Sequence, residues 1–482
     1  MGDYFHSVTL DEEKCRGCTN CIKRCPTEAI RVRKGKARII NERCIDCGEC
    51  IRICPYHAKK AITDDFDCIK SYAYRIAIPA PTLYGQFKPI YTRNRILNAI
   101  RQLGFDDVYE VARGAEFVTE ATRELLKRQD VKKPLISSAC PAVVRLIQVR
   151  FPNLIDHLVR LESPMEVSAK LIKRKASLAE GIDPADIGVF FITPCAAKAT
   201  SVKAPYENLK SSVDGVISIN DIYLRLLSRL EKAGEQEQLA RASFKGIQWA
   251  GSGGEGLALE TDRFLAVDGI HNVITILEEI ENDKLEDVDF IEALSCSGGC
   301  LGGPLTVENV YVAKTRLKKH VDEAKAAGFL EPAAEKASQD IVWTGSIVYK
   351  PVMKLDDDLG KAMKKLEELE KINNGLPGLD CGACGAPNCR ALAEDIVRGI
   401  ANETDCIFKL REKVRNLAAQ MIELESKIPP VMDNEAKYRH AGTGTVPQTG
   451  PEQGTIAEAG REQGTMAEAD PEQETGTAEV SK

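Results

Sequence analysis

Cysteines carry most of the chemistry that this sequence can offer. The chain has 482 residues and 17 cysteines, and nearly all of the cysteines fall in tight groups. Two groups share one spacing: Cys15-x2-Cys18-x2-Cys21-x3-Cys25-Pro26 and Cys44-x2-Cys47-x2-Cys50-x3-Cys54-Pro55. The N-terminus has no apolar segment typical of an export signal, so disulfides are not expected, and we interpret these groups as thiolate ligands of metal.

The doubled run has the spacing of bacterial ferredoxins, in which three close thiolates hold one 4Fe-4S cube and the fourth cysteine reaches the other cube. On that pattern one cluster takes Cys15, Cys18, Cys21 and Cys54, and the other takes Cys44, Cys47, Cys50 and Cys25. Structural zinc is the alternative, although zinc sites rarely use eight cysteines in a doubled pattern. Such a segment receives and passes single electrons, and its cysteine pattern does not identify a substrate.

A second set of cysteines lies far apart in the sequence. Its members are Cys140 in SSACPAVV, Cys195 in TPCAAK, and Cys296 and Cys300 in EALSCSGGCLGG. Cys195 follows the apolar run IGVFFIT, which predicts a buried strand, and ligands of open α/β sheets bind just past such strand ends. The glycines around Cys300 would let the backbone approach a bulky cofactor. The four cysteines form one site only if the fold brings three loops together.

These three motifs resemble the active-site signatures of the FeFe hydrogenases, in the same order, and the resemblance extends over about residues 1 to 350. It implies that Cys140, Cys195 and Cys296 hold a 4Fe-4S cube. Cys300 would also bridge this cube to a two-iron subsite that carries CO, cyanide and an azadithiolate, together the H-cluster. The resemblance therefore implies reversible conversion of H2 into two protons and two electrons.

Other residues receive roles from the same resemblance. Lys198 would donate a hydrogen bond to one cyanide, since a lysine ammonium is a compact donor. Pro81 and Thr82 match the turn that faces the other cyanide. Trp249 aligns with an aromatic residue near the iron, although core packing alone would explain it.

The sequence also departs from the family pattern. The family's proton-shuttling cysteine is Ala139 here, and the methionines that flank the two-iron subsite are Thr193 and Leu294. A glycine of the last motif is Pro304. Because loss of a positioned acid or base costs about 10²- to 10⁴-fold in rate, we predict slow turnover, as in the sensory branch of the family (groups C and D).

Glu255 stands where the family has an apolar residue near the subsite. One interpretation is that it relays protons in place of the missing cysteine. The other, which the sequence alone favours, is an exposed glutamate at a helix N-terminus, stabilised by the helix dipole.

A third set, Cys381-x2-Cys384-x4-Cys389-x16-Cys406, resembles a small single-cluster module of anaerobic redox proteins. It implies one more 4Fe-4S cube, with zinc as the alternative because four cysteines also suit a tetrahedral site. Cys68 has no partner at ligand spacing and is expected to be a buried thiol.

The pattern between these motifs predicts five segments. An α+β ferredoxin-like domain over 1–70 needs metal to hold its fold. Strand-like runs that alternate with amphipathic helices predict an α/β H-cluster domain over 71–350, with two lobes and a cleft. A helical 4Fe-4S module (351–406), a heptad helix (407–432) and a disordered repeat tail (433–482) follow. Residues 407–428 would pair two chains or lie on their own protein.

Charge and hydropathy limit the partners. The net charge is −7 and no basic run stands out, so nucleic acid is not expected. No apolar run reaches about 18 residues, so we expect no membrane span and a cytoplasmic protein. The expected partners are H2 and protons, hydrogenase maturation proteins, and a redox partner such as ferredoxin or a signalling protein. The alternatives are a ferredoxin-linked catalytic hydrogenase and a non-catalytic iron-sulfur protein resembling the Nar and Narf proteins.

Overall fold

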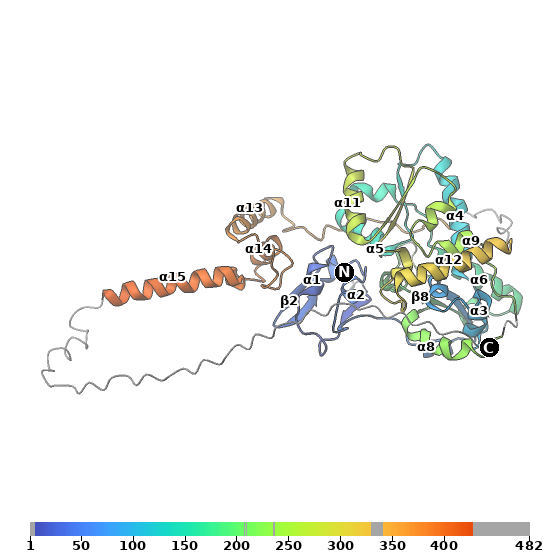
Figure 1. Cartoon of the computed structure of the whole chain (residues 1–482). Helices are drawn as coiled ribbons and strands as arrows, with labels where there is room; N and C mark the ends of the chain where they lie inside the picture. The colour runs from blue at the N-terminus through green and yellow to red at the C-terminus, as the bar shows by residue number, and fades with distance from the viewer. Residues whose placement is uncertain (1–4, 207, 209, 235–236, 329–340, 428–482) are drawn as a thin grey trace, which may run out of the picture. The chain divides into compact units, whose positions relative to one another are not determined.

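The computed structural model describes residues 5–206, 208, 210–234, 237–328 and 341–427. Figure 1 follows the chain from its N-terminal strands, in blue, to the helix α15, in orange. The chain divides into two units, Met1–Val414 and Arg415–Lys482. The tail expected to be disordered, 433–482, lies outside the described residues. Among the described helices, none has the length and apolar character that a bilayer span requires.

Residues 5–70 form two small antiparallel sheets and two four-residue helices. The elements are β1 (Val8–Leu10) paired with β4 (Lys59–Ala61), β2 (Ile30–Arg33) paired with β3 (Lys36–Ile39), α1 (Asn20–Lys23) and α2 (Glu49–Arg52). The buried cluster of this segment combines Cys15, Cys21 and Cys50 with apolar side chains such as Ile22 and Ile30. An apolar core this small agrees with a segment that depends on metal to fold.

A four-stranded parallel sheet begins the central part of the chain, in the order β6-β5-β8-β9. Its strands are β5 (Tyr74–Pro79), β6 (Asp107–Val108), β8 (Ile187–Thr193) and β9 (Gly215–Ser218), and the helices packed on it are α3 (Arg93–Arg101), α6 (Pro164–Glu180) and α8 (Ile219–Leu230). On β8, Phe190 and Ile192 pack with α3 and α8, whereas Val189 and Phe191 pack with α6. Both faces are buried, as is usual for parallel strands. The strand predicted from IGVFFIT is confirmed.

A second parallel sheet has the order β10-β11-β7. Its elements are β7 (Leu135–Ile136), β10 (Phe264–Asp268), β11 (Phe290–Leu294) and the covering helices α4 (Val111–Lys127), α5 (Pro141–Arg150), α10 (Gly254–Ala258) and α11 (Ile270–Glu281). Ile291 packs with α5 and α11, and Phe290 packs with α4 and α10. In the first sheet, the run DVYEVA (107–112) supplies only the two residues of β6, because Val111 already begins α4.

The remaining helices are α7 (Ala196–Lys203), α9 (Phe244–Gln248), α12 (Val310–Ala326), α13 (Leu359–Gly375), α14 (Cys389–Val397) and α15 (Ile407–Ser426). Short 3-10 helices are η1 (Asn41–Arg43), η2 (Phe66–Ser71), η3 (Pro81–Gln86), η4 (Pro152–His157), η5 (Pro184–Asp186), η6 (Gly299–Gly302) and η8 (Glu403–Asp405). Leu369 of α13 and Leu392 of α14 pack with Cys406 in a small separate core. In α15, none of the described residues is buried.

Candidate metal centres

The eight cysteines of the N-terminal run surround two separate cavities. One is lined by Cys15, Cys18, Cys21 and Cys54. The other is lined by Cys25, Cys44, Cys47 and Cys50. The fold thus groups the fourth cysteine of each run with the first three of the other run. Four thiols around one cavity are the donor set that a 4Fe-4S cube requires.

The surroundings of these thiols fit a bound cation. Burial raises the pKa of Cys21 to about 11 and that of Cys50 to about 12, against the opposing charge of Lys59. A thiolate is the form that binds metal, so a metal charge has to offset this burial. Backbone N–H groups also point at sulfur, from Ala29 to Cys25 at 3.2 Å.

The second set of cysteines comes together at the carboxyl ends of the two parallel sheets. Cys140 directly precedes α5, Cys195 lies between β8 and α7, Cys296 follows β11 and Cys300 lies in η6. Burial raises the pKa of Cys195 to about 12, and the charges of Cys140 and Cys300 add to this effect. Burial also raises the pKa of Cys296, and the other three cysteines again contribute. The structure therefore brings these thiols close enough to interact.

Backbone hydrogen bonds hold the loops of this site against one another. The N–H of Leu305 donates to Pro194 O at 3.0 Å, and the N–H of Leu301 donates to Ala250 O at 3.1 Å. Gly299 has φ +79°, and a Cβ atom there would lie 2.6 Å from Ser252 N. Only glycine fits this approach, since other residues avoid positive φ and carry that Cβ.

The ends of β5 and β8 add two hydroxyl groups to the site. Thr82, in η3 after Pro81, is fully buried, and its Oγ1 has no hydrogen-bond partner among the described residues. Thr193 Oγ1 accepts from the N–H of Cys195 at 3.1 Å. Leu294 is buried at the end of β11. A buried, unsatisfied hydroxyl is costly by itself, so Thr82 fits a site that receives a polar ligand atom.

Lys198 lies beside the cysteines of this set. Its charge acts against burial to lower the pKa of Cys195 and of Cys140. Its Nζ also lies 5.9 Å from the centre of the Phe191 ring. A cation in this place suits an anionic ligand of the same site.

Glu255 is buried, with 4% of its surface exposed, so the interpretation as an exposed glutamate is wrong. Ser137 Oγ donates to Glu255 Oε2 at 2.6 Å, and Ser137 Oγ also accepts from the N–H of Ala139 at 3.2 Å. Burial raises the pKa of the Glu255 carboxyl, and the nearby charge of Glu292 raises it further. Glu255 is therefore a buried carboxyl with a raised pKa, and the hydroxyl of Ser137 links it to the backbone N–H of Ala139.

The sequence analysis missed Glu292, on β11. Its carboxylate accepts from the N–H of Gly253 and of Gly256, both at 2.9 Å, and burial raises its pKa. The signal available in the sequence was an acidic residue inside the apolar run DFIEAL. Because a Cβ on Gly256 would lie 2.1 Å from the Phe264 ring, this glycine serves internal packing.

Trp249 belongs to a packed core. Its Nε1 donates to Thr119 Oγ1 at 3.2 Å, and the ring packs in one cluster with Phe290 and Ala139. Core packing therefore accounts for Trp249. Ala139, which belongs to the same cluster, directly precedes Cys140.

The C-terminal cysteines also gather. Cys384, Cys389 and Cys406 share one small core, and burial together with the charges of Cys381 and Cys406 raises the pKa of Cys384. Cys68, by contrast, is half-buried against the core of the first sheet.

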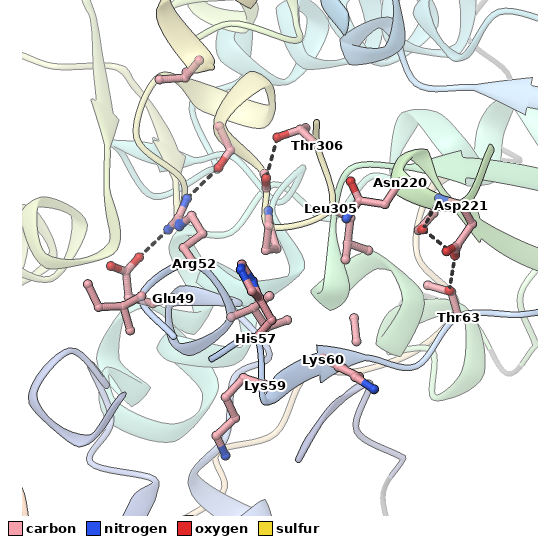
Figure 2. A pocket seen from close by; sticks show the side chains of 18 of the residues that line it. Glu49, Arg52, His57, Lys59, Lys60, Thr63, Asn220, Asp221, Leu305 and Thr306 are labelled. Carbon is pink, nitrogen blue, oxygen red and sulfur yellow. Dashed lines mark hydrogen bonds and ion pairs between the residues drawn. The ribbon is translucent and has the colours of Figure 1, made fainter. Parts of the chain in front are cut away.

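A separate cavity, of about 850 Å³, has no cysteine among the described residues that line it (Figure 2). It lies between the segment from Glu49 to Thr63 and the loop after Cys300. Arg52 joins the two sides, since its guanidinium pairs with Glu49 and donates to Gly302 O at 2.6 Å.

Comparisons with known proteins agree with the three cysteine sets. The family described as iron only hydrogenase large subunit, C-terminal domain, matches residues 73–255 and 226–304. The 4Fe-4S dicluster domain family matches residues 7–55, and a family described as an Fe-S cluster family matches residues 376–408.

Several curated relatives carry hydrogenase names. Iron hydrogenase 1 of Clostridium pasteurianum is 24% identical over 276 residues, 46% of this chain and 48% of that protein. The periplasmic Fe hydrogenase large subunit of Nitratidesulfovibrio vulgaris is 32% identical over 229 residues, 44% of this chain and 54% of that protein. The chain thus spans about half the length of these relatives.

Two other kinds of match were found. Cytosolic Fe-S cluster assembly factor nar1 of Talaromyces marneffei is 28% identical over 142 residues, 27% of this chain and 24% of that protein. A solved variant of FeFe-hydrogenase HydA1 from Chlamydomonas reinhardtii has a TM-score of 0.43 at 15% identity, covering 58% of this chain and 95% of that one. The family match and the hydrogenase relatives together show that residues 73–304 form a domain of the iron only hydrogenase large subunit family.

Proposed function

We propose that this protein converts H2 reversibly into two protons and two electrons at an H-cluster. The observation that carries the proposal is the convergence of Cys140, Cys195, Cys296 and Cys300, from three separate loops, at the carboxyl ends of the sheets. When bound, the six-iron cofactor supplies the centre that splits H2, and the protein supplies binding, orientation and electrostatics. The two sheets would form the two lobes around it.

The residues around these cysteines would orient the cofactor. Cys300 would bridge the cube and the two-iron subsite, Lys198 would donate to one cyanide, and Thr82 Oγ1 would donate to the other. The unsatisfied hydroxyl of Thr82 supports the last role, because a bound acceptor would remove the cost of its burial. Thr193 and Leu294 would border the subsite.

Glu255 would carry protons in place of the family's proton-shuttling cysteine, whose position Ala139 occupies in this chain. The carboxyl has a raised pKa, and its Oε2 accepts from Ser137 Oγ, which in turn reaches Ala139 N. A carboxyl that holds its proton near neutral pH is suited to both giving and taking it.

We further propose that turnover is low and that the protein reports H2 to a partner. Alanine at 139 and the absence of the flanking methionines support low turnover. The partner would be a signalling protein, with ferredoxin as the alternative, and a second copy of this chain would pair through residues 407–428. In α15, the side chains of Leu410, Val414, Leu417, Met421 and Leu424 are all exposed at heptad spacing, which supports such pairing.

Infrared spectroscopy after maturation with the two-iron cofactor tests the proposal. Bands of bound CO and cyanide are expected from the wild-type chain and not from a Cys300→Ala variant. If the wild-type chain takes up iron for its cubes yet shows no such bands, the proposed H2 chemistry is refuted. H2 turnover as fast as in rapid hydrogenases would refute only the low-turnover and sensory part.

The similarity to nar1 favours a second candidate, a non-catalytic iron-sulfur protein. Such a protein would keep the cubes and lack the two-iron subsite. The same infrared measurement separates the two, because only the hydrogenase shows diatomic ligands.

A further inference from the structure

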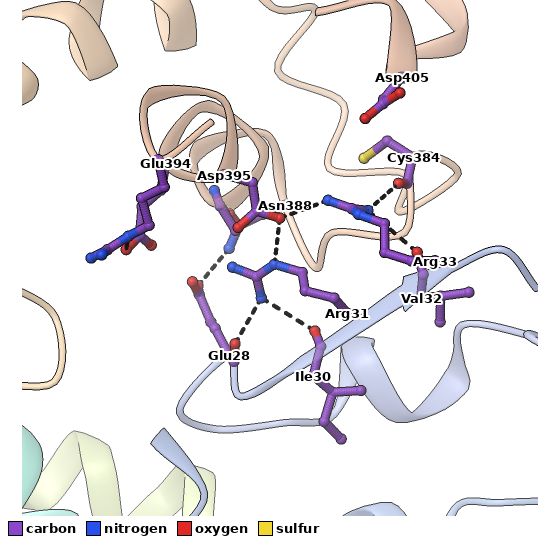
Figure 3. A network of polar contacts seen from close by, with 12 residues as sticks. Glu28, Ile30, Arg31, Val32, Arg33, Cys384, Asn388, Glu394, Asp395 and Asp405 are labelled. Atoms are coloured by element: carbon purple, nitrogen blue, oxygen red, sulfur yellow. Dashed lines mark hydrogen bonds and ion pairs between the residues drawn. The ribbon is translucent and has the colours of Figure 1, made fainter. Parts of the chain in front are cut away.

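The C-terminal cysteine module is fastened to the N-terminal segment by buried charges (Figure 3). Asp395 of α14 is 2% exposed, and its Oδ2 accepts from Arg31 Nε and Arg33 Nη2, each at 2.7 Å. Beside it, Glu394 is bound by Arg43, with one contact at 3.1 Å. A buried carboxylate with two arginine partners holds one geometry, because any other leaves charges unpaired in the interior.

Backbone contacts bring the cysteine loop itself onto strand β2. Val32 N donates to Gly385 O at 2.8 Å, and Arg33 Nη1 donates to Cys384 O at 2.7 Å. Gly385 has φ +80°, and a Cβ there would lie 1.9 Å from Val32 O. The approach therefore depends on glycine at the position next to a cysteine of the set.

Val32 also lies at one of the two N-terminal cavities. It lines the cavity of Cys15, Cys18, Cys21 and Cys54, and it does not line the cavity of Cys25, Cys44, Cys47 and Cys50. One residue thus lies between the C-terminal cysteine loop and one particular N-terminal cavity.

The second N-terminal cavity faces the central site instead. Cys47, which lines it, packs in the cluster that includes Cys140 and Cys195. Gly48, the next residue, has φ +75°, and a Cβ there would lie 2.4 Å from Pro304 Cγ in the loop after Cys300. The four cysteine sets are therefore ordered in space.

We propose that Asp395, Arg31, Arg33 and Gly385 seat the C-terminal module so that its cysteine set exchanges single electrons with the Cys15–Cys18–Cys21–Cys54 set. The Cys25–Cys44–Cys47–Cys50 set then stands between that pair and the central site. In each exchange one cluster is oxidised by one electron and the other is reduced by one, and no bond or proton is transferred. The inference rests on the proposed 4Fe-4S clusters and not on the proposed H2 chemistry.

Electron paramagnetic resonance on the full chain tests this arrangement. The protein is loaded with 4Fe-4S clusters only, without the two-iron cofactor, and fully reduced by a chemical reductant. The C-terminal signal is identified as the difference from a Cys406→Ala variant. We expect this signal to be split by a neighbouring reduced cluster, to lose the splitting in Cys18→Ala, and to keep it in Cys47→Ala. The opposite pattern, or splitting unchanged in both variants, overturns the proposed pairing.

Variants at the junction test the seating residues. Asp395→Ala should lose the splitting while its iron content stays within about one cluster's iron of the wild-type content. Glu370→Gln is the control and should keep the splitting. Glu370 pairs with Arg390 at the surface of the same module. If Asp395→Ala loses its clusters, Gly385→Ala and Gly399→Ala decide the question. Both place alanine at positive φ, but only position 385 has an atom within 4 Å of the new Cβ. Equal behaviour of these two variants, or intact splitting in Asp395→Ala, overturns the seating role.

Discussion

Replacing Glu255 by glutamine removes the proposed proton carrier from the buried pair of Glu255 and Glu292 without removing its bulk. Glutamine still accepts the hydrogen bond that Ser137 Oγ makes at 2.6 Å, so the local packing is retained. Loss of a positioned acid or base typically costs about 10²- to 10⁴-fold in rate. At about 1.4 kcal/mol per tenfold, the expected loss is about 3 to 5 kcal/mol of transition-state stabilisation.

The pH profile adds a second readout. Burial and the charge of Glu292 raise the pKa of Glu255, so its proton is lost at a higher pH than that of an ordinary glutamate. The wild-type rate of H2 oxidation should therefore change with pH above the usual range of a carboxyl, while the Glu255→Gln rate stays low and flat. The assay is dye-linked H2 oxidation by matured protein between about pH 4 and 9, which spans the ordinary and the raised carboxyl range.

Glu260→Gln is the matched control. Glu260 follows α10, is exposed, and pairs with Lys245 and Arg123 at 2.7 Å. Its loss should leave both the rate and the profile unchanged. Equal infrared bands in all three proteins show equal cofactor loading. Turnover of Glu255→Gln within twofold of wild type would refute the proton-relay role.

Three further predictions concern the site, the core and the metal. Ala139→Cys should raise turnover by about tenfold or more if a second acid–base group is limiting, and an unchanged rate would show that the proton path at this position does not limit the reaction. Glu110→Ala should lower the free energy of unfolding by about 3 to 5 kcal/mol. The variant leaves Arg93 without its buried ion pair at 3.0 Å and Tyr84 without its hydrogen-bond acceptor. Urea denaturation measures the loss, and a loss below about 1 kcal/mol contradicts the prediction. Iron chelation should open residues 5–70 before the central sheets, because the eight cysteines that line the two cavities of this segment would lose their metal; hydrogen exchange that stays protected there contradicts it.

Spacing made the local part of the metal sites predictable. The run Cys15-x2-Cys18-x2-Cys21-x3-Cys25 has one known way of wrapping two cubes, and the cavities group the cysteines in that way. Likewise, the largely apolar run IGVFFIT predicts β8, since a strand buried on both faces of a parallel sheet needs such a run.

Contacts between distant segments were harder to predict. The hydrogen bond and the nearby charge of Glu255 come from Ser137 and Glu292, which lie on other segments and meet it only in the folded chain. A glutamate after glycines at a helix start is usually exposed, so the local pattern pointed the wrong way. The pairing of Asp395 with Arg31 joins positions 364 residues apart, and nothing in the spacing of either segment signals it.

The fit of Gly48 against Pro304 limits how this protein can be recombined with its relatives. Any side chain at 48 would collide with the proline ring, 2.4 Å from the first added carbon. A chimera that imports a foreign N-terminal domain with a larger residue there would be misaligned with the loop after Cys300. When these domains are exchanged between relatives, the residues at positions 48 and 304 should therefore be transferred together.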